Sequence, residues 1–141
     1  MIILDSNVLS ELMQPAPEPR VFAWLDSQPR ELLWTTTINI FEVRVGLQSM
    51  APGKRQILLS ENFGLVLEKL EHRVAAFDLA AANRASELMA ERKKRGRAIE
   101  IRDTMIAGIA LAQHAALATR NTRDFEDALI PVVNPWVYSV R

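Results

Sequence analysis

The chain contains no cysteine, which excludes disulfide bonds and metal sites built from thiolates. Histidine is nearly as scarce, since His72 and His114 are the only two and form no paired metal-ligand motif. The 17 basic residues equal the 17 acidic ones in number, so the chain lacks the overall positive charge of many nucleic-acid-binding proteins. Any chemistry on nucleic acid must therefore come from a local site.

Long apolar runs are also absent. No stretch approaches the roughly 20 residues that a helix needs to cross a bilayer. The first apolar run, at residues 2–4, is too short for a signal peptide and has no basic flank. We therefore expect a cytoplasmic protein that makes no contact with a membrane.

What the chain does contain is an ordinary globular composition, with 49% apolar and 24% charged residues in 141. This length suits one domain, residues 1–141. Apolar periodicity predicts strands at 2–4, 32–35, 74–77, 116–118 and 132–133, and helices from about 7, at 19–27, 38–47, 54–71, 79–94 and 101–114. Alternation of short strands with helices predicts an α/β fold, a three-layer α/β/α domain with a central parallel sheet.

Asp5 directly follows the first apolar strand and precedes Ser6 and Asn7, two residues that favour turns and helix caps. In open parallel sheets, ligands bind at the edge where the strands end. A charge that follows a wholly apolar strand also needs a partner. We therefore expect Asp5 to anchor an acidic site at this edge.

Three other acids stand in related contexts. Glu42 has apolar neighbours on both sides in a helix that begins just after a strand, Asp103 lies near the start of the most apolar helix, and Asp124 follows strand 116–118. Each can therefore lie near the edge that carries Asp5. Gathered carboxylates repel one another, and Mg²⁺ or Mn²⁺, which prefer oxygen ligands, would neutralise them. The sequence thus predicts a Mg²⁺ or Mn²⁺ site.

Five segments occur along the chain in a fixed order. They are Asp-Ser-Asn-Val-Leu-Ser-Glu-Leu from Asp5, Phe-Glu-Val-Arg-Val-Gly-Leu around Glu42, Arg-Asp-Thr-Met-Ile-Ala around Asp103, Leu-Ala-Thr-Arg-Asn-Thr-Arg-Asp-Phe around Asp124, and a terminal Val-Asn-Pro-Trp. Together they resemble PIN-domain ribonucleases, and most of all the VapC and FitB-like toxins of type II toxin–antitoxin pairs. Each motif alone is weak, but the ordered set covers nearly the whole chain.

The resemblance implies an endoribonuclease that uses Mg²⁺ or Mn²⁺ to activate the water that cleaves RNA phosphodiesters. Asp5, Glu42 and Asp103 match the three core acidic residues of the family, and Asp124 matches the more variable fourth. These four residues are therefore expected to be both catalytic and metal-binding.

Other positions are given roles by the same resemblance. Ser6 stands where the family usually has Thr, and Asn7 matches the family's Asn, so both are expected to support Asp5. Arg102 departs from the family, which usually has a small residue before the third acid.

Expected partners are an RNA substrate and a cognate antitoxin protein, which holds toxins of this kind and often places a basic residue in the acidic site. A homodimer, and a larger toxin–antitoxin assembly, are expected as well. Four residues beside the acidic edge are predicted to bind substrate or phosphate: Thr119, Arg120, Asn121 and Arg123.

Two other functions are compatible with acids gathered at strand ends. A phosphoryl-transfer domain of the receiver type would need a lysine after a late strand, and the chain has none beyond Lys94. A catalytically silent PIN-like binding protein would not need all four acids.

The basic run of Arg92, Lys93, Lys94, Arg95 and Arg97 could guide a phosphate backbone, but we prefer a solvated helix end. The three tryptophans could stack on bases, but packing in the core or a dimer interface is preferred for Trp24, Trp34 and Trp136.

Overall fold

The computed structural model describes residues 1–139, and a five-stranded parallel sheet runs through its centre. The sheet order is β3-β2-β1-β4-β5, for β1 (Ile2–Leu4), β2 (Leu33–Thr36), β3 (Val74–Ala75), β4 (Ala116–Ala118) and β5 (Val132–Val133). Ile3 on β1 pairs with Trp34 on one side and with Leu117 on the other. The strand order reverses between β1 and β4, and ligands of open α/β sheets bind at such a point.

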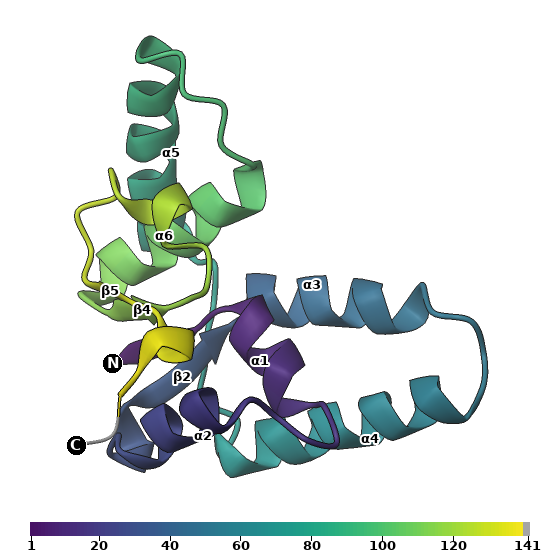
Figure 1. Cartoon of the computed structure of the whole chain (residues 1–141). Coiled ribbons are helices and arrows are strands. Elements are labelled where there is room, and N and C mark those ends of the chain that lie inside the picture. The colour runs from purple at the N-terminus through teal and green to yellow at the C-terminus, as the bar shows by residue number, and fades with distance from the viewer. Residues whose placement is uncertain (140–141) are drawn as a thin grey trace.

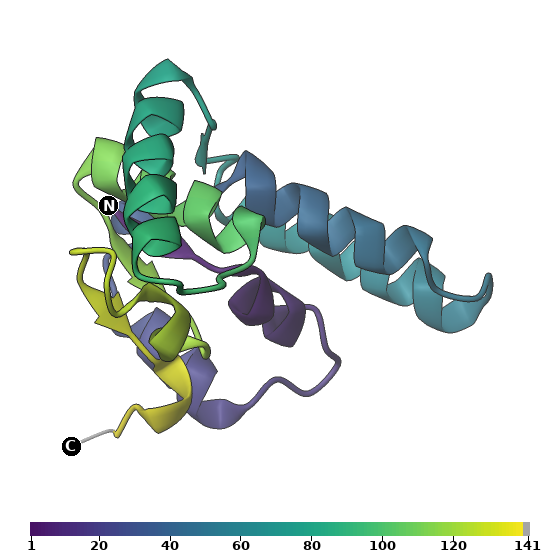
Figure 2. The same cartoon turned by 90° about the horizontal axis from the view of Figure 1, so that it is seen from above.

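Helices cover both faces of the sheet, which confirms the three-layer prediction (Figure 1). One face carries α1 (Ser6–Leu12), α2 (Pro19–Asp26), α3 (Thr37–Gln48) and α4 (Lys54–Lys69), and the other carries α5 (Leu79–Lys94) and α6 (Ile101–Gln113). Seen from above, α3 and α4 form a hairpin that extends to one side of the sheet (Figure 2).

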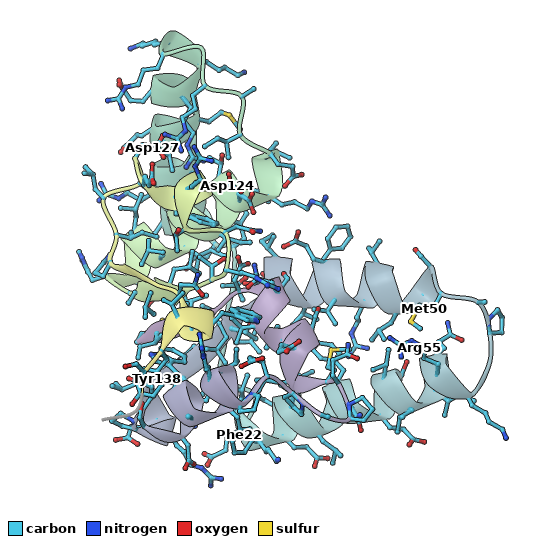
Figure 3. All side chains as sticks on the ribbon, viewed as in Figure 1. Phe22, Met50, Arg55, Asp124, Asp127 and Tyr138 are labelled. Atoms are coloured by element: carbon cyan, nitrogen blue, oxygen red, sulfur yellow. The ribbon has the colours of Figure 1, made fainter. Side chains whose placement is uncertain are left out.

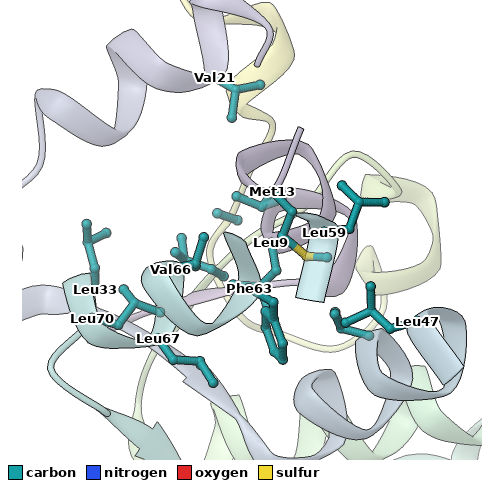
Figure 4. Packing of buried hydrophobic residues seen from close by; sticks show 14 of the residues in the cluster. Leu9, Met13, Val21, Leu33, Leu47, Leu59, Phe63, Val66, Leu67 and Leu70 are labelled. Carbon is teal, nitrogen blue, oxygen red and sulfur yellow. The ribbon is translucent and has the colours of Figure 1, made fainter. Parts of the chain in front are cut away.

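The side chains of β1 divide the core into two parts. Leu4 packs in the cluster under α1–α4, whereas Ile3 packs in the cluster under α5 and α6, because successive strand residues point to opposite faces. In the first cluster, Leu9 of α1 and Met13, which directly follows α1, lie against Phe63 of α4 (Figure 4). Both faces of β1 are therefore packed, and only its end is free to carry polar chemistry.

Helix α6 packs directly against α5, and a glycine makes this contact possible. A Cβ on Gly108 would stand 2.6 Å from both the carbonyl oxygen of Ala81 and the Cβ of Ala85. Ile106 and Ile109 of the same helix are fully buried, as expected for the most apolar helix. This close contact fixes α6, which carries Asp103, against α5.

Several boundaries differ from the sequence predictions. Strand β2 begins one residue late, after the 3₁₀ turn η1 (Arg30–Leu32), and β3 has two residues instead of four. The helix expected to reach residue 71 ends at Lys69, because Glu71 and His72 adopt positive φ values of 52° and 53°. Within residues 1–139, every helix is too short or too polar to span a bilayer. Two more 3₁₀ turns lie in the C-terminal part of the chain: η2 (Thr122–Phe125), between β4 and β5, and η3 (Pro135–Val137), after β5.

Candidate active site

Asp5 is the buried centre of the polar edge, with 4% of its surface exposed. Its backbone N–H donates to the carbonyl of Ala118 at 3.0 Å, which extends the contact between β1 and β4. Its side chain caps α1 and accepts a hydrogen bond from the Ser6 N–H at 2.9 Å. Asp5 therefore stands where the central strand ends and α1 begins, as predicted.

Two buried polar side chains complete the hydrogen bonds of Asp5. Asn39 of α3 donates from Nδ2 to Asp5 Oδ1 at 2.8 Å, and Thr119 at the end of β4 donates from Oγ1 to Asp5 Oδ2 at 2.6 Å. Burial raises the pKa of Asp5, and these hydrogen bonds act against that rise. The Asn39 amide is oriented in turn, because its Oδ1 accepts from Thr36 Oγ1 at 2.6 Å.

Ser6 connects the first acid to the second. Its Oγ donates to Glu42 Oε1 at 2.9 Å and accepts from Asn39 Nδ2 at the same distance. The other oxygen of Glu42 lies 3.8 Å from Nη1 of Arg102, whose Nε donates to Glu100 at 2.9 Å. Burial, and next the charge of Asp5, raise the pKa of Glu42 against the effects of Ser6 and Arg102. Glu42 therefore lies within the field of Asp5.

Asp103, in the first turn of α6, has a pKa raised to about 7. Burial is the largest cause, and the charges of Asp5, Asp124 and Glu42 add to it in that order. Asp124 lies in η2, after β4, and also raises the pKa of Asp5. The fold thus brings the four predicted acids into one shared electrostatic field.

The four carboxylates do not form a ready-made metal cage. Among residues 1–139, no three Asp, Glu or His side chains are spaced to hold a metal ion as they stand. The donor set still fits a hard cation, because it consists of carboxylate oxygen alone. The mutual repulsion that raises the pKa of Asp103 is also the repulsion that a divalent cation relieves.

Comparison with known proteins identifies the arrangement. A family model described as PIN domain matches residues 2–128. The chain belongs to the PIN domain family. It is 42% identical over 137 residues to VapC ribonuclease Y4jK of Sinorhizobium fredii, covering 96% of this chain and 98% of that protein. It is 35% identical over 137 residues to toxin FitB of Neisseria gonorrhoeae, covering 96% of this chain and 99% of that protein. The crystal structure of FitAcB from Neisseria gonorrhoeae gives a TM-score of 0.87 at 35% identity, covering 97% of this chain and 99% of that chain.

Of the residues expected to bind substrate in this PIN domain, Thr119 has a different position. It is fully buried, and its hydroxyl donates to Asp5 and accepts from the Asn121 N–H at 3.1 Å. A buried hydroxyl bonded to Asp5 supports that acid and does not face a substrate, which corrects the expectation. Asn7 acts beside it, since its Nδ2 donates to Thr119 Oγ1 at 3.2 Å.

The other three residues of that group are exposed. The guanidinium of Arg120 lies 5.1 Å from the ring centre of Trp136, and the backbone N–H of Arg120 donates to Asn7 Oδ1 at 3.2 Å. Asn121 and Arg123 are exposed on either side of the start of η2, close to Asp124 in the chain. These three positions are open to solvent at the rim of the acidic edge.

The basic run at the end of α5 is only partly a solvated helix end. Lys93, Lys94 and Arg95 are exposed, as preferred, but Arg92 is 1% exposed and donates to Asp127 from Nε at 3.1 Å and from Nη2 at 2.9 Å. The prediction of a solvated helix end is therefore wrong for Arg92. Its position on α5, four residues after Leu88 on the buried face, is the sequence signal that could have shown this.

The tryptophans and Asn39 complete the comparison with the sequence. Trp24 is 4% exposed in the core, and Trp34 and Trp136 are half-buried against the two core clusters, in line with a packing role. Asn39 was not selected as a site residue from the sequence. Its contact with Asp5 depends on how α3 packs across β1, which no local pattern specifies.

Proposed function

We propose that residues 1–141 are a single PIN domain that acts as a Mg²⁺- or Mn²⁺-dependent endoribonuclease and as the toxin of a type II toxin–antitoxin pair. The observation that carries the proposal is the shared electrostatic field of the four acids at the switch point of the sheet. A relative named VapC ribonuclease, 42% identical over nearly the full length of both proteins, supports the reaction.

Four carboxylates would hold the divalent ion: Asp5, Glu42, Asp103 and Asp124. A divalent ion at this edge supplies two things, a water acidified enough to attack at neutral pH and positive charge to offset the phosphate. Asp5 is firmly oriented, because donors from α1, α3 and the residue directly after β4 bond to both of its oxygens. The Ser6 hydroxyl donates to Glu42 Oε1 and so orients the Glu42 carboxylate relative to Asp5.

The chain's own residues also control protons and substrate approach. In the metal-free chain the Asp103 carboxyl keeps its proton up to about pH 7, so loading the site with a cation displaces a proton from this residue. The exposed side chains of Arg120 and Arg123 stand at the rim, where they can attract the phosphates of an RNA backbone. Thr119 and Asn7 act behind them as supports of Asp5.

A protein partner follows from the same charges. An acidic pocket without a matching cation attracts Arg or Lys from a partner chain, and charge-assisted bonds to carboxylates are strong. The relative named toxin FitB and the FitAcB structure support a cognate antitoxin as that partner.

The receiver-type alternative is less well supported. Phosphoryl transfer of that kind needs a lysine at the acidic edge after a late strand. The four lysines of the chain, Lys54, Lys69, Lys93 and Lys94, all lie in the helices α4 and α5. The cation beside Glu42 is an arginine, Arg102.

Growth on induction tests the proposal against a silent binding protein. Expression of the chain without a partner in a bacterial host should arrest growth, and Glu42→Ala should relieve the arrest at equal protein level. Sequencing of RNA 5′ ends after induction should give new ends that Glu42→Ala abolishes. Arrest by Glu42→Ala at the wild-type level, with no new RNA ends from either protein, would contradict the nuclease proposal.

A further inference from the structure

Among residues 1–139, the most deeply buried cationic side chain takes no direct part in the proposed reaction. Arg92 of α5 is 1% exposed, and its fork donates to both carboxylate oxygens of Asp127, at 3.1 and 2.9 Å. A guanidinium removed from water is stable only when its donors are matched. The pair with Asp127 uses Nε and Nη2 and leaves Nη1 for another acceptor.

The remaining bonds of Arg92 reach the neighbours of two site acids. Its Nη1 donates at 2.7 Å to Oγ1 of Thr104, the residue that directly follows Asp103. Its Nη2 also donates at 2.8 Å to the backbone carbonyl of Asp124. In Figure 3, Asp124 and Asp127 lie together in the part of the molecule formed by α5 and α6. One side chain thus joins α5 to the first turn of α6 and to η2.

The η2 turn needs such a link more than a helix would. It spans four residues of 3₁₀ geometry and has no side-chain cap. Phe125 and Ala128, 1% and 2% exposed, anchor its apolar side in the core. On its polar side, the carboxylates of Asp124 and Asp103 repel each other. Arg92 donates both to the backbone carbonyl of Asp124 and to Thr104, the residue that follows Asp103.

A second arginine shows what a purely structural role looks like. Arg73 donates from Nε to the Leu33 carbonyl at 2.9 Å and from Nη2 to the Arg30 carbonyl at 2.6 Å, and pairs with Glu71 at 3.3 Å. Leu33 is the first residue of β2, so these bonds lie at the sheet edge opposite the acids. Arg73 therefore serves as a matched control.

We propose that Arg92 is a positioning residue of the acidic site, which fixes Asp103 and Asp124 relative to each other and thereby sets the affinity for a divalent cation. This inference rests on the proposed function. The bonds to Thr104 and to the Asp124 carbonyl distinguish it from a simple ion pair, because they join Arg92 to α6 and η2 in addition to Asp127, which Arg97 also approaches at 3.9 Å.

The test separates positioning from stability with a double variant. Arg92→Met with Asp127→Leu replaces the ion pair by apolar side chains, an exchange that often preserves folding, but removes the bonds to Thr104 and Asp124. Binding of Mn²⁺ to the purified full-length chain, without RNA, is followed by the electron paramagnetic resonance of free Mn²⁺. We expect the double variant to stay folded by circular dichroism and to bind Mn²⁺ about tenfold more weakly or worse.

Two further variants keep the test decisive. Arg92→Lys keeps the charge beside Asp127 but cannot reach all three acceptors, so it should also weaken Mn²⁺ binding, even if the double variant fails to fold. Arg73→Met should lower the melting temperature and leave the Mn²⁺ affinity unchanged.

Different outcomes would overturn the positioning role of Arg92 and the proposed nuclease function. If the wild-type chain binds Mn²⁺ and cleaves RNA while the Arg92 variants bind Mn²⁺ as tightly, the positioning role is overturned and the nuclease stands. Equal weakening by Arg73→Met would also overturn it, as a general effect of stability. A wild-type chain that neither binds Mn²⁺ nor cleaves RNA would overturn both.

Discussion

Asp5 and its three donors show how single residues shape this site. Ser6 of α1, Asn39 of α3 and Thr119, directly after β4, reach the same carboxylate. Each bond offsets part of the cost of burying the charge, and each also fixes the direction of an oxygen. The support of Asp5 is therefore distributed over three elements that meet only in the folded chain.

Asn39→Ala should lower both stability and activity. The change removes one of the two donors to Oδ1 of the buried Asp5 carboxylate and leaves only the Ser6 N–H, which should cost about 1–3 kcal/mol in urea unfolding. Cleavage of RNA by the folded protein should fall as well, because Asp5 loses its orientation. Asn62→Ala is the control, since Asn62 Nδ2 donates at 2.8 Å to the Met13 carbonyl on the α1–α4 side. It should lose stability and keep activity; equal activity in both variants would argue against the role of Asn39.

The stability of the metal-free chain should fall as pH rises from about 4 to about 7. Asp103 has a pKa of about 7 in the folded chain against 3.8 as its ordinary value, so between these values unfolding releases a proton and a higher pH favours unfolding. Above pH 7 the contribution of Asp103 is constant. Urea unfolding in EDTA from pH 4 to 8 should show this loss, and Asp103→Asn should reduce the slope. An unchanged slope in Asp103→Asn would assign the effect to other groups.

The four candidate acids, and Ser6 and Asn7 beside the first of them, could be picked out from the sequence, but the supporting roles of Asn39 and Thr119 could not. A carboxylate after an apolar strand is conspicuous in the sequence, whereas Asn39 and Thr119 look like ordinary cap and loop residues. Arg92 was hidden for the same reason, within a run of exposed basic residues. Their roles depend on contacts between residues more than 30 positions apart, such as Asn39 with Asp5 and Arg92 with Asp127.

At the scale of elements, the pairing of α5 with α6 determines where Asp103 stands. Gly108 lets the two helices approach until a Cβ would touch the backbone of Ala81. Asp103 lies more than one turn before this contact, in the same helix. The distance between α6 and α5 therefore helps to determine where Asp103 lies at the acidic edge.

Gly108→Ala should destabilise the protein even though alanine favours helices. The new Cβ would stand 2.6 Å from Ala81 O, and such overpacking costs about 1–3 kcal/mol. Gly64→Ala in α4 is the matched control, because nothing lies within 4 Å of its Cβ and the helix should gain about 0.5–1 kcal/mol. Thermal unfolding of both variants checks the pair, and a Gly108→Ala protein as stable as wild type would contradict the packing.

Helices of this chain were predicted better than short strands and turns. The helix at 79–94 was predicted at both ends, because its alanine-rich sequence favours a helix and Gly96 suits a C-terminal cap. The structure adds a side-chain cap at Asp78 and gives Gly96 a φ of 66°. Strand β3, with only two residues, was predicted twice as long. Strand β3 ends at Ala75 because its partner strand β2 ends at Thr36. Its length is therefore set by the sheet and not by the sequence of residues 74–77.

For the whole molecule, the sheet order is what turns scattered acids into one site. β1 is flanked by β2 and β4, so Asp5, the start of α3 and the segment after β4 meet at one edge. The alternation of strands and helices predicted this parallel sheet, and hence the meeting of the acids. It could not give the distances, which depend on helix packing, so the absence of a ready-made three-ligand group among residues 1–139 was not foreseen.

Cleavage of RNA by the purified chain tests the central claim most directly, namely that the acids form one cation-dependent nuclease site. Wild-type protein should cleave single-stranded RNA in Mn²⁺ and stop when EDTA is added. Asp103→Asn should lower the initial rate about a hundredfold. The control is Asp26→Asn, an exposed acid on α2, which should match wild type. Cleavage that persists in EDTA, or an Asp103→Asn protein as active as wild type, would contradict the account.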